Sequence, residues 1–594
     1  MKTLKKLMAI LLCFALISGS AMVISDAGLT ERIVSTSDSR KAFGNKINSV
    51  IQTIVKGVCR VYPKPASWKS LDKYTGENVY NEDDGRQDYQ RQKTENAVWK
   101  AGYSSASIIP ADFKIGKYYL GRQLNLFASG ESAKAKGILD DQRVRVICLD
   151  DNSGAGAVVM AVIDGLGVTG TTIRKIRKAL SSYIEDGRIA AVNISATHCH
   201  SALDTQGVST SFSYVFTANI LTNLLGLDKA STSNDPFIEN LVNVTAEQIK
   251  KAYANMEEGE MYYSKADISS LCGDKRGYVE KQNMPKAGIV RFVPNNRQSK
   301  PTYLVNFTCH PTNVSASAGL VSADYVYYMD ECFKQAGANF VMTQGAVGQI
   351  SASSFEVENK ENYTSISSSC KEKIGEKLYK KSGVEKADSL GEKAAEILLK
   401  ASNENEEKIE PILNTKYKEI YFKAQNYIMN LACQTRLVDN EVYTTGKGID
   451  DVVMPSEIGY VELGSRVAFG LFPCELYPEV FHGQEIITAD KENYSWDGNQ
   501  WEIPAAKDMV REGIDIYSVC FANDYIGYVV PDNFYSGWGH WSLRGSDRAN
   551  YQYDTNASFF EYAFGGTADQ ILSAGKHCAS QIMNTFKRIT DITK

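Results

Sequence analysis

Apolar residues along the chain fall into two kinds of run, and their order predicts an α/β architecture. Short β-branched runs bounded by glycine or aspartate are typical of buried strands, and they lie at 108–110, 144–149, 158–163, 189–197, 289–293, 302–307, 339–342 and 467–472. Apolar residues at helical spacing predict helices over 171–183, 237–256, 325–336, 388–402 and 570–589. The order strand, helix, strand between 158 and 197 indicates a βαβ unit, and hence layered mixed sheets with flanking helices.

Three segments fall outside this pattern. Residues 1–27 join a basic start to an apolar run, which predicts a signal peptide, with an uncleaved membrane anchor as the alternative. Residues 28–97 are polar and are interpreted as an N-terminal extension, and 355–385, rich in Lys, Glu and Ser, as a surface insertion. The rest of 98–594 is expected to form one domain. We therefore expect a secreted or extracellular protein, or one anchored by its first segment.

Composition narrows the function classes. Of the 594 residues, 43% are apolar and 23% charged, which excludes wholesale disorder. The net charge of −5 gives no basic face for nucleic acid. The 12 cysteines contain no CxxC pair, so no disulfide is assigned. The oligomeric state is left open.

Histidines follow two of the predicted strands. Thr197-His198-Cys199-His200-Ser201 comes directly after one strand, and alternation along a strand would put both imidazoles on one face with Cys199 opposite. His310 ends the strand at 302–307, and Glu475 follows the strand at 467–472. Functional groups gather at the carboxyl ends of strands, which favours one shared site. Zinc prefers imidazole nitrogen and carboxylate oxygen, whereas a hydrogen-bonded histidine pair without a catalytic role is the alternative.

A glycine-rich turn follows the strand at 339–342. It reads Gly345-Ala346-Val347-Gly348-Gln349-Ile350-Ser351 and could bring backbone amides to a ligand and present Ser351. The turn differs from the G-x-S-x-G elbow of serine hydrolases, because no glycine flanks Ser351. An ordinary strand-to-loop turn is the alternative.

Taken together, these segments resemble the neutral (alkaline, non-lysosomal) ceramidase family over roughly residues 98 to 590. The family's double-histidine motif is similar to 196–201 (ATHCHS), and its HPT segment with a following V-S-S-D stretch is similar to 310–312 and 321–324. The remaining matches are the turn at 348–352, the segment Pro473-Cys474-Glu475, and Tyr525-Ile526-Gly527-Tyr528 with the later Tyr553. The five segments occur in the family's order.

The resemblance implies a function and a set of site residues. It implies hydrolysis of an amide bond in ceramide or a related N-acyl lipid by attack of zinc-bound water. The implied zinc ligands are His198, His310, Glu475 and Tyr528. The implied catalytic residues are His200, Arg276, Ser351 and Tyr553. The partner would be a lipid-like or N-acylated small molecule, with peripheral membrane contact.

The chain also departs from the family. After the double histidine it has Ala202-Leu203-Asp204 where ceramide-cleaving members have glycine and proline, and the turn has Gln349 and Ala352 in place of Asn or Asp and Pro. No C-terminal immunoglobulin-like domain is expected after Tyr553. Because the loops differ more than the metal-site residues, an esterase or another amidase on the same zinc site is an alternative. Two others are a non-catalytic exported binding protein and a serine hydrolase acting through Ser351.

Overall fold

The computed structural model describes most of the chain from residue 37 onward. The described residues are 37–62, 69–70, 89–121, 134–207, 212–227, 235–276, 278–352, 355–357, 372–423, 425–436, 438, 440, 442–444, 452–487, 499–535 and 573–594. Residues 1–36, which contain the predicted signal peptide or anchor, and Tyr553 lie outside these ranges. Among the described residues, no helix combines the length and apolar character needed to cross a membrane.

The larger of two main sheets has the order β12-β10-β9-β7-β2-β4-β5-β6, with β14 added to β7. It is mixed: β10 runs parallel to β12 and β5 runs parallel to β6, whereas the pairs between them are antiparallel. The strands are β2 Trp99–Ser107, β4 Arg143–Asp150, β5 Ala157–Ile163, β6 Ile189–Ala196, β7 Glu257–Ala266, β9 Ala287–Pro294, β10 Thr302–Phe307, β12 Asn339–Gln344 and β14 Glu407–Ile409.

The smaller main sheet has the order β1-β16-β17-β18-β20, with β15 paired to β17. Its strands are β1 Lys69–Ser70, β15 Leu413–Lys423, β16 Tyr443–Thr444, β17 Val452–Leu463, β18 Val467–Leu471 and β20 Asp515–Val519. Three short pairs complete the described strands: β3 Gly137–Ile138 with β11 Leu320–Val321, β8 Gly273–Asp274 with β13 Ile350–Ser351, and β19 Glu475–Leu476 with β21 Tyr528–Val529.

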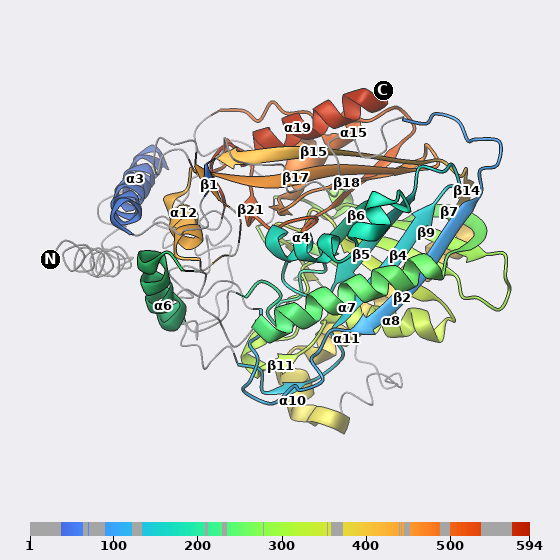
Figure 1. Ribbon diagram of the computed structural model, residues 1–594, viewed down its shortest axis with the longest axis horizontal. Coiled ribbons are helices and arrows are strands. Elements are labelled where there is room, and N and C mark those ends of the chain that lie inside the picture. Colours follow the sequence, from blue (N-terminus) through green and yellow to red (C-terminus); the bar gives the residue numbers. More distant parts are fainter. Residues whose placement is uncertain are drawn as a thin grey trace.

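Helices cover the outer faces of the two sheets (Figure 1). One apolar core lies between the sheets and joins side chains such as Leu149 and Met160 to Val461 and Phe469. The helices are α3 Ser37–Val61, α4 Gly170–Lys178, α5 Ser181–Glu185, α6 Phe212–Leu225, α7 Asp235–Ala254, α8 Tyr325–Gln335, α10 Glu376–Lys381, α11 Val384–Asn405, α12 Tyr427–Gln434, α13 Pro478–His482, α15 Ala506–Met509 and α19 Cys578–Thr593.

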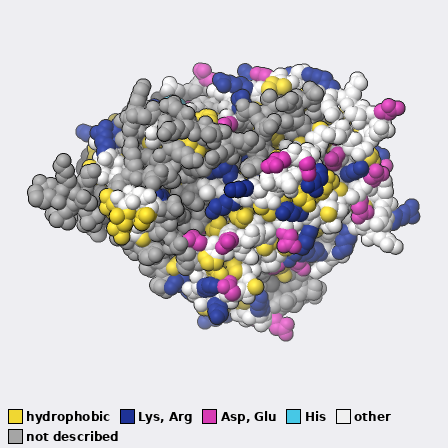
Figure 2. All heavy atoms as spheres, in the orientation of Figure 1, with side chains coloured by type: hydrophobic (Ala, Val, Ile, Leu, Met, Phe, Trp, Pro, Cys, Tyr) yellow, Lys and Arg dark blue, Asp and Glu magenta, His cyan; other side chains and the backbone are white. Residues whose placement is uncertain are grey.

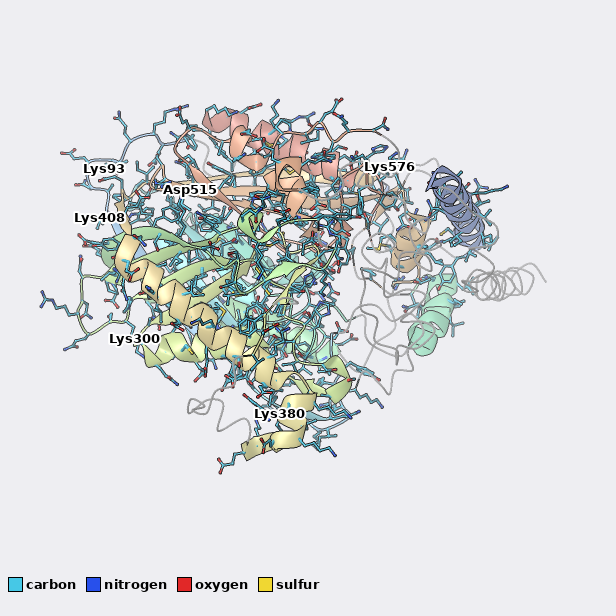
Figure 3. All side chains as sticks on the ribbon, turned by 180° about the vertical axis from the view of Figure 1, so that it is seen from behind. Lys93, Lys300, Lys380, Lys408, Asp515 and Lys576 are labelled. Carbon is cyan, nitrogen blue, oxygen red and sulfur yellow. The ribbon has the colours of Figure 1, made fainter. Side chains whose placement is uncertain are left out.

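Each outer helix packs through an apolar stripe. Helix α7 packs on the larger sheet at β2, β4 and β5, with α4 beside it. On the same sheet α8 packs at β12 and α11 at β7 and β9, and α19 packs on the smaller sheet at β15 and β17. Seen from behind, α11 lies across the outside of the molecule, and the short α10 that carries Lys380 lies near one end of it (Figure 3). Basic and acidic side chains are interspersed over the face drawn in Figure 2, in keeping with the small net charge.

The predicted fold class, layered mixed sheets with flanking helices, is confirmed. The βαβ unit is present, since β5 and β6 are parallel and α4 and α5 lie between them in the chain. The strand predicted at 108–110 is wrong: β2 ends at Ser107, and a proline at 110 cannot donate a ladder hydrogen bond. The helix predicted over 171–183 is divided, because α4 ends at Lys178 and Leu180 precedes a separate α5.

Two segments outside the predicted domain core contribute buried side chains. Within the predicted N-terminal extension, α3 packs against α12, and the Gln434 side chain donates to the carbonyls of Cys59 (3.0 Å) and Tyr62 (2.9 Å). Near the end of the predicted surface insertion, Tyr379 of α10 is buried and donates to Asp388 of α11 at 2.6 Å. The domain boundaries themselves stay predictions.

An ion-paired arginine is buried where β4 meets α8. Arg145 donates to Asp164 (2.8 Å) and to Asp330 of α8 (2.9 Å), and all three side chains are almost inaccessible to solvent. Two carboxylates in an apolar surrounding require such a cation, because an uncompensated buried charge is costly.

We expect Arg145→Ala to destabilise the protein by about 3–5 kcal/mol, since it leaves Asp164 and Asp330 without their shared cation. Urea denaturation measures the change. Arg188→Ala is the control, because Arg188 pairs with Asp186 at the exposed surface and its loss is expected to leave stability little changed. Equal effects of the two substitutions would show that burial does not increase the contribution of the Arg145 ion pairs to stability.

Candidate metal centre

The ends of parallel strands from both sheets converge at one place. The chain leaves β6 toward His198, β10 toward His310, and β18 toward Glu475. The buried amide of Gln344, at the end of β12, donates to the carbonyls of Thr197 (3.1 Å) and Cys309 (2.8 Å). One side chain therefore ties together the two segments that carry the histidines.

His198 sits in a strained and crowded position. Its backbone has φ +67°, in the left-handed region that non-glycine residues rarely adopt, and Phe521, at φ +56°, stacks on its ring with centroids 4.1 Å apart. Its Nδ1 lies 2.7 Å from the carbonyl oxygen of Leu166. A carbonyl only accepts hydrogen bonds, so Nδ1 carries the proton and Nε2 presents its lone pair.

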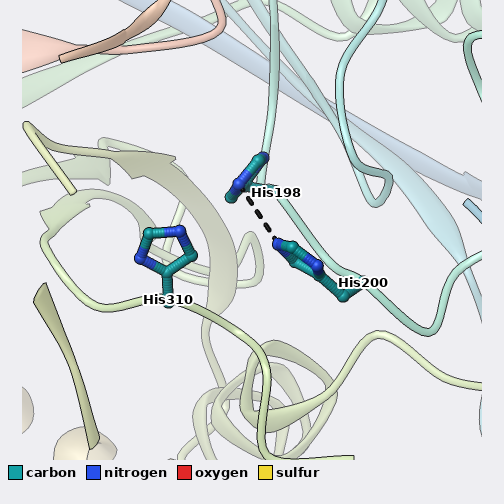
Figure 4. Close-up of side chains that lie close together, drawn as sticks. All are labelled: His198, His200 and His310. Atoms are coloured by element: carbon teal, nitrogen blue, oxygen red, sulfur yellow. Dashed lines mark hydrogen bonds between the residues drawn. The ribbon is translucent and has the colours of Figure 1, made fainter. Parts of the chain in front are cut away.

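His198 and His200 face the same centre, as predicted (Figure 4). Their Nε2 atoms are 3.2 Å apart, while Cys199 between them points away and donates to the carbonyl of Ala323 at 3.1 Å. Side-chain alternation along the strand, which was the predicted reason, is wrong. Strand β6 ends at Ala196, and the positive φ of His198 directs the two rings toward the same centre.

His310 is held in a similar way. Its Nδ1 lies 2.9 Å from the carbonyl oxygen of Ile350, which also accepts from its backbone N–H. Its Nε2 is therefore unprotonated when the ring is neutral. The His310 backbone bridges to Ser351 on β13, so the glycine-rich turn borders the site.

Glu475 lies between these two imidazoles and is fully buried. One carboxylate oxygen is 2.7 Å from Nε2 of His310 and the other is 3.2 Å from Nε2 of His198. Gly348 permits this placement, because a Cβ there would lie 2.7 Å from the carbonyl oxygen of Leu476, next to Glu475. The turn predicted at 345–351 thus packs directly against the strand that carries the carboxylate.

The donor atoms fit a cation. Two imidazole lone pairs and two carboxylate oxygens, all acceptors, converge in a buried space, and acceptors at such distances repel unless a proton or metal ion lies between them. The ring nitrogens of His198, His200 and His310 lie within 4.8 Å of one another. Nitrogen and oxygen donors of this kind suit zinc among other divalent ions.

Burial controls the charge states at the centre. It lowers the pKa of His200 well below its usual range, with further lowering by His198 and His310, and it also lowers the pKa of His310. Burial acts to raise the pKa of Glu475, but the two imidazoles outweigh it and the pKa is lowered. Burial therefore favours the neutral form of His200 and His310 beside an ionised Glu475, which is the protonation pattern of a ligand set.

Two tyrosines lie beside this carboxylate. Tyr528, the predicted ligand, is buried on β21 and is the backbone partner of Glu475 on β19. Tyr525 was not among the predicted ligands; burial, and then the charge of Glu475, raise its pKa well above the usual range. Its ring also lies 6.3 Å from that of His198. Tyr528 as a ligand stays a prediction, and Tyr525 is a second phenol near the centre.

The remaining predicted residues have different surroundings. Ser351 is buried, and its Oγ has no hydrogen-bond partner within the described ranges. Arg276 is paired with Asp274 (2.9 Å) and Glu479 (2.8 Å), so it links β8 to α13. That network positions the segments around Ser351 and Glu475, while a direct catalytic role for Arg276 stays a prediction. Tyr553 falls outside the described residues.

The two tyrosines can be separated by substitution. We expect Tyr528→Phe to weaken divalent-metal binding by about 10–100-fold, because Tyr528 is the predicted ligand and lies beside Glu475 as its backbone partner. Tyr525→Phe is the matched comparison and is expected to have the smaller effect. Titration with zinc in competition with a chelator measures both, and the reverse order would assign Tyr525, rather than Tyr528, to the metal.

Comparison with solved structures identifies the fold. A crystal structure of neutral ceramidase from Pseudomonas aeruginosa is similar with a TM-score of 0.51 and 15% sequence identity, covering 78% of this chain and 76% of the other. A ceramidase complexed with C2 gives a TM-score of 0.50 and 14% identity over 78% and 77% of the two chains. No family model and no curated protein sequence matches the chain. The chain therefore has the fold of the neutral ceramidase catalytic domain.

Proposed function

We propose that this protein is an exported, metal-dependent hydrolase that cleaves an amide bond in ceramide or a related N-acyl lipid. One observation carries the proposal: the unshared electron pairs of His198, His310 and Glu475 converge in a buried space, where only a cation or proton relieves their repulsion. The ceramidase fold supports the choice of reaction. Export rests on the basic and apolar pattern of residues 1–27.

The residues of the centre would have separate roles in this reaction. His198, His310, Glu475 and Tyr528 would hold a zinc ion. When bound, that ion supplies a Lewis acid next to the reacting carbonyl. The backbone carbonyls of Leu166 and Ile350 keep each Nδ1 protonated and so keep each Nε2 available.

His200 is the residue best placed to move protons. It is only partly buried, and its Nε2 faces the centre beside Nε2 of His198. As water adds to the substrate carbonyl, this atom accepts a proton from the water. It then returns that proton to the nitrogen as the C–N bond breaks, so that a carboxylic acid and an amine leave.

Ser351 would orient the substrate. Its Oγ is buried and free of partners within the described ranges, so it can donate to the substrate carbonyl or accept from the amide N–H. No histidine among those residues hydrogen-bonds to it, as a serine nucleophile would require. An orienting role therefore agrees with the geometry better than covalent catalysis.

Metal content provides the first test. We expect the wild-type protein to bind about one divalent ion per chain and His310→Ala to lose both the ion and amide hydrolysis, since a structural ligand is removed. Elemental analysis and release of fatty acid from a fluorescent ceramide measure the two. His577→Ala is the control, because that exposed histidine pairs with Asp532 away from the centre. Full activity in metal-free protein would overturn the proposal.

The second test concerns Ser351. We expect Ser351→Ala to lower kcat/KM by about 10–100-fold, as when a buried hydrogen bond to substrate is lost. A fluorophosphonate probe is expected to leave the wild-type serine unlabelled. Stoichiometric labelling of Ser351, together with loss of activity independent of metal content, would instead indicate a serine hydrolase.

A further inference from the structure

Exposed apolar side chains gather at the end of helix α6. Nine large apolar side chains are exposed among the described residues, and four of these fall between residues 221 and 227. They are Leu221 (58% exposed), Leu224 (46%), Leu225 (62%) and Leu227 (52%). Figure 2 shows an apolar patch at the end of the molecule where Figure 1 labels α6. Single exposed apolar residues are ordinary on soluble proteins, whereas a group of them marks a binding surface.

Helix α6 presents its polar side to the protein and its apolar side to the outside. The side chains of Asn219 and Asn223, one turn apart, are buried and donate to the carbonyls of Thr435 (2.9 Å) and Gln434 (3.2 Å) at the end of α12. The exposed leucines of the helix lie on the opposite face. A surface helix of a soluble protein normally has the reverse arrangement, with its apolar stripe packed on the core. The leucine face therefore lacks the protein core that such a stripe usually covers.

The end of the helix holds this leucine face in place. Gly226 has φ +68°, a conformation that favours glycine, and the N–H of Leu227 donates to the carbonyl of Thr222 at 2.8 Å. This hydrogen bond is part of a common helix-ending motif. The carbonyl of Leu227 in turn accepts from the Arg436 side chain at 3.1 Å. The four leucines are thus presented together by an ordered helix end.

The charges around this face favour a lipid surface as its partner. Helix α6 has no Asp, Glu, Lys or Arg in its 14 residues, so it can enter an apolar phase without the cost of burying a charge. Helix α3 packs beside it, because Val58 and Tyr62 share an apolar cluster with Ile220. Helix α3 has five basic residues and one acidic residue, and basic side chains lie at the same end of the molecule in Figure 2. Leucines next to positive charge suit the surface of an anionic bilayer.

We propose that the exposed leucines of α6 insert into the surface of a membrane that carries anionic lipids. Helix α3 follows residues 1–36, which contain the predicted signal peptide or anchor, so the chain enters the described structure at this same end. The inference goes beyond the proposed hydrolysis, because docking requires neither a metal ion nor turnover. For a protein that acts on N-acyl lipids, docking brings the chain to the phase that holds such substrates.

Vesicle binding tests the proposal. The full chain is titrated with vesicles of phosphatidylcholine and phosphatidylglycerol, and the bound fraction is measured by sedimentation. We expect Leu221→Ser/Leu224→Ser/Leu225→Ser to bind about 100-fold more weakly than wild type, about fivefold for each half-exposed leucine removed from lipid. All three side chains are exposed, so the variant should fold, and its circular dichroism and thermal unfolding verify this.

A matched control removes the same number of apolar side chains from other parts of the surface. Ile115→Ser/Leu378→Ser/Ile592→Ser changes three exposed residues that lie outside α6, at 73%, 38% and 54% exposure. We expect this variant to bind the vesicles as wild type does. An equal loss in both triple variants would overturn the assignment to α6.

A second readout separates insertion of α6 from binding through residues 1–27. In the presence of vesicles, Leu225→Trp should show blue-shifted emission, and brominated phosphatidylcholine should quench it beyond the quenching of the wild-type tryptophans. No added quenching in the vesicle-bound variant overturns the proposal, as does unchanged vesicle binding by the triple leucine variant. Self-association of the wild type without vesicles that this triple variant abolishes, measured by light scattering, would overturn it in favour of a second copy of the chain.

Discussion

The arrangement depends on one electrostatic constraint, a buried carboxylate facing two imidazole lone pairs. Backbone carbonyls at Leu166 and Ile350 fix the protons of His198 and His310 on Nδ1, so both Nε2 atoms face Glu475 as acceptors. Hydrogen bonds among protein atoms cannot satisfy this set when the rings are neutral, whereas a divalent cation satisfies all members at once. A centre of this kind stabilises the folded chain when loaded and is a source of repulsion when empty.

The fold supplies this constraint by bringing together strand ends from two sheets. His198 and His310 follow strands of the larger sheet, whereas Glu475 follows a strand of the smaller one, so the centre exists only when the sheets are packed on each other. His198 and Phe521 both have backbone conformations in the left-handed region, and their rings stack on each other next to the centre. Packing between the two sheets therefore holds the His198 imidazole in its strained orientation.

The histidines and the carboxylate could be predicted because each stands within a few residues of a strand with a clear apolar pattern. The tyrosine ligand could not be predicted from spacing, because Tyr525 and Tyr528 lie three residues apart in a segment to which no periodicity applies. Helix α3 was missed although its buried residues Ile51, Val55 and Cys59 recur at helical spacing, since the polar residues between them dominate the composition.

The candidate metal donors and the loops around them belong to different structural elements. The donors and His200 belong to segments at the ends of sheet strands, which the two-sheet core holds in place. The chain departs from the ceramidase pattern in loops, after His200 and in the turn at 348–352. Substitution in such loops can change what the site accepts without moving a histidine donor, because backbone carbonyls hold both rings. A chain can therefore keep its metal donors while its preferred substrate changes.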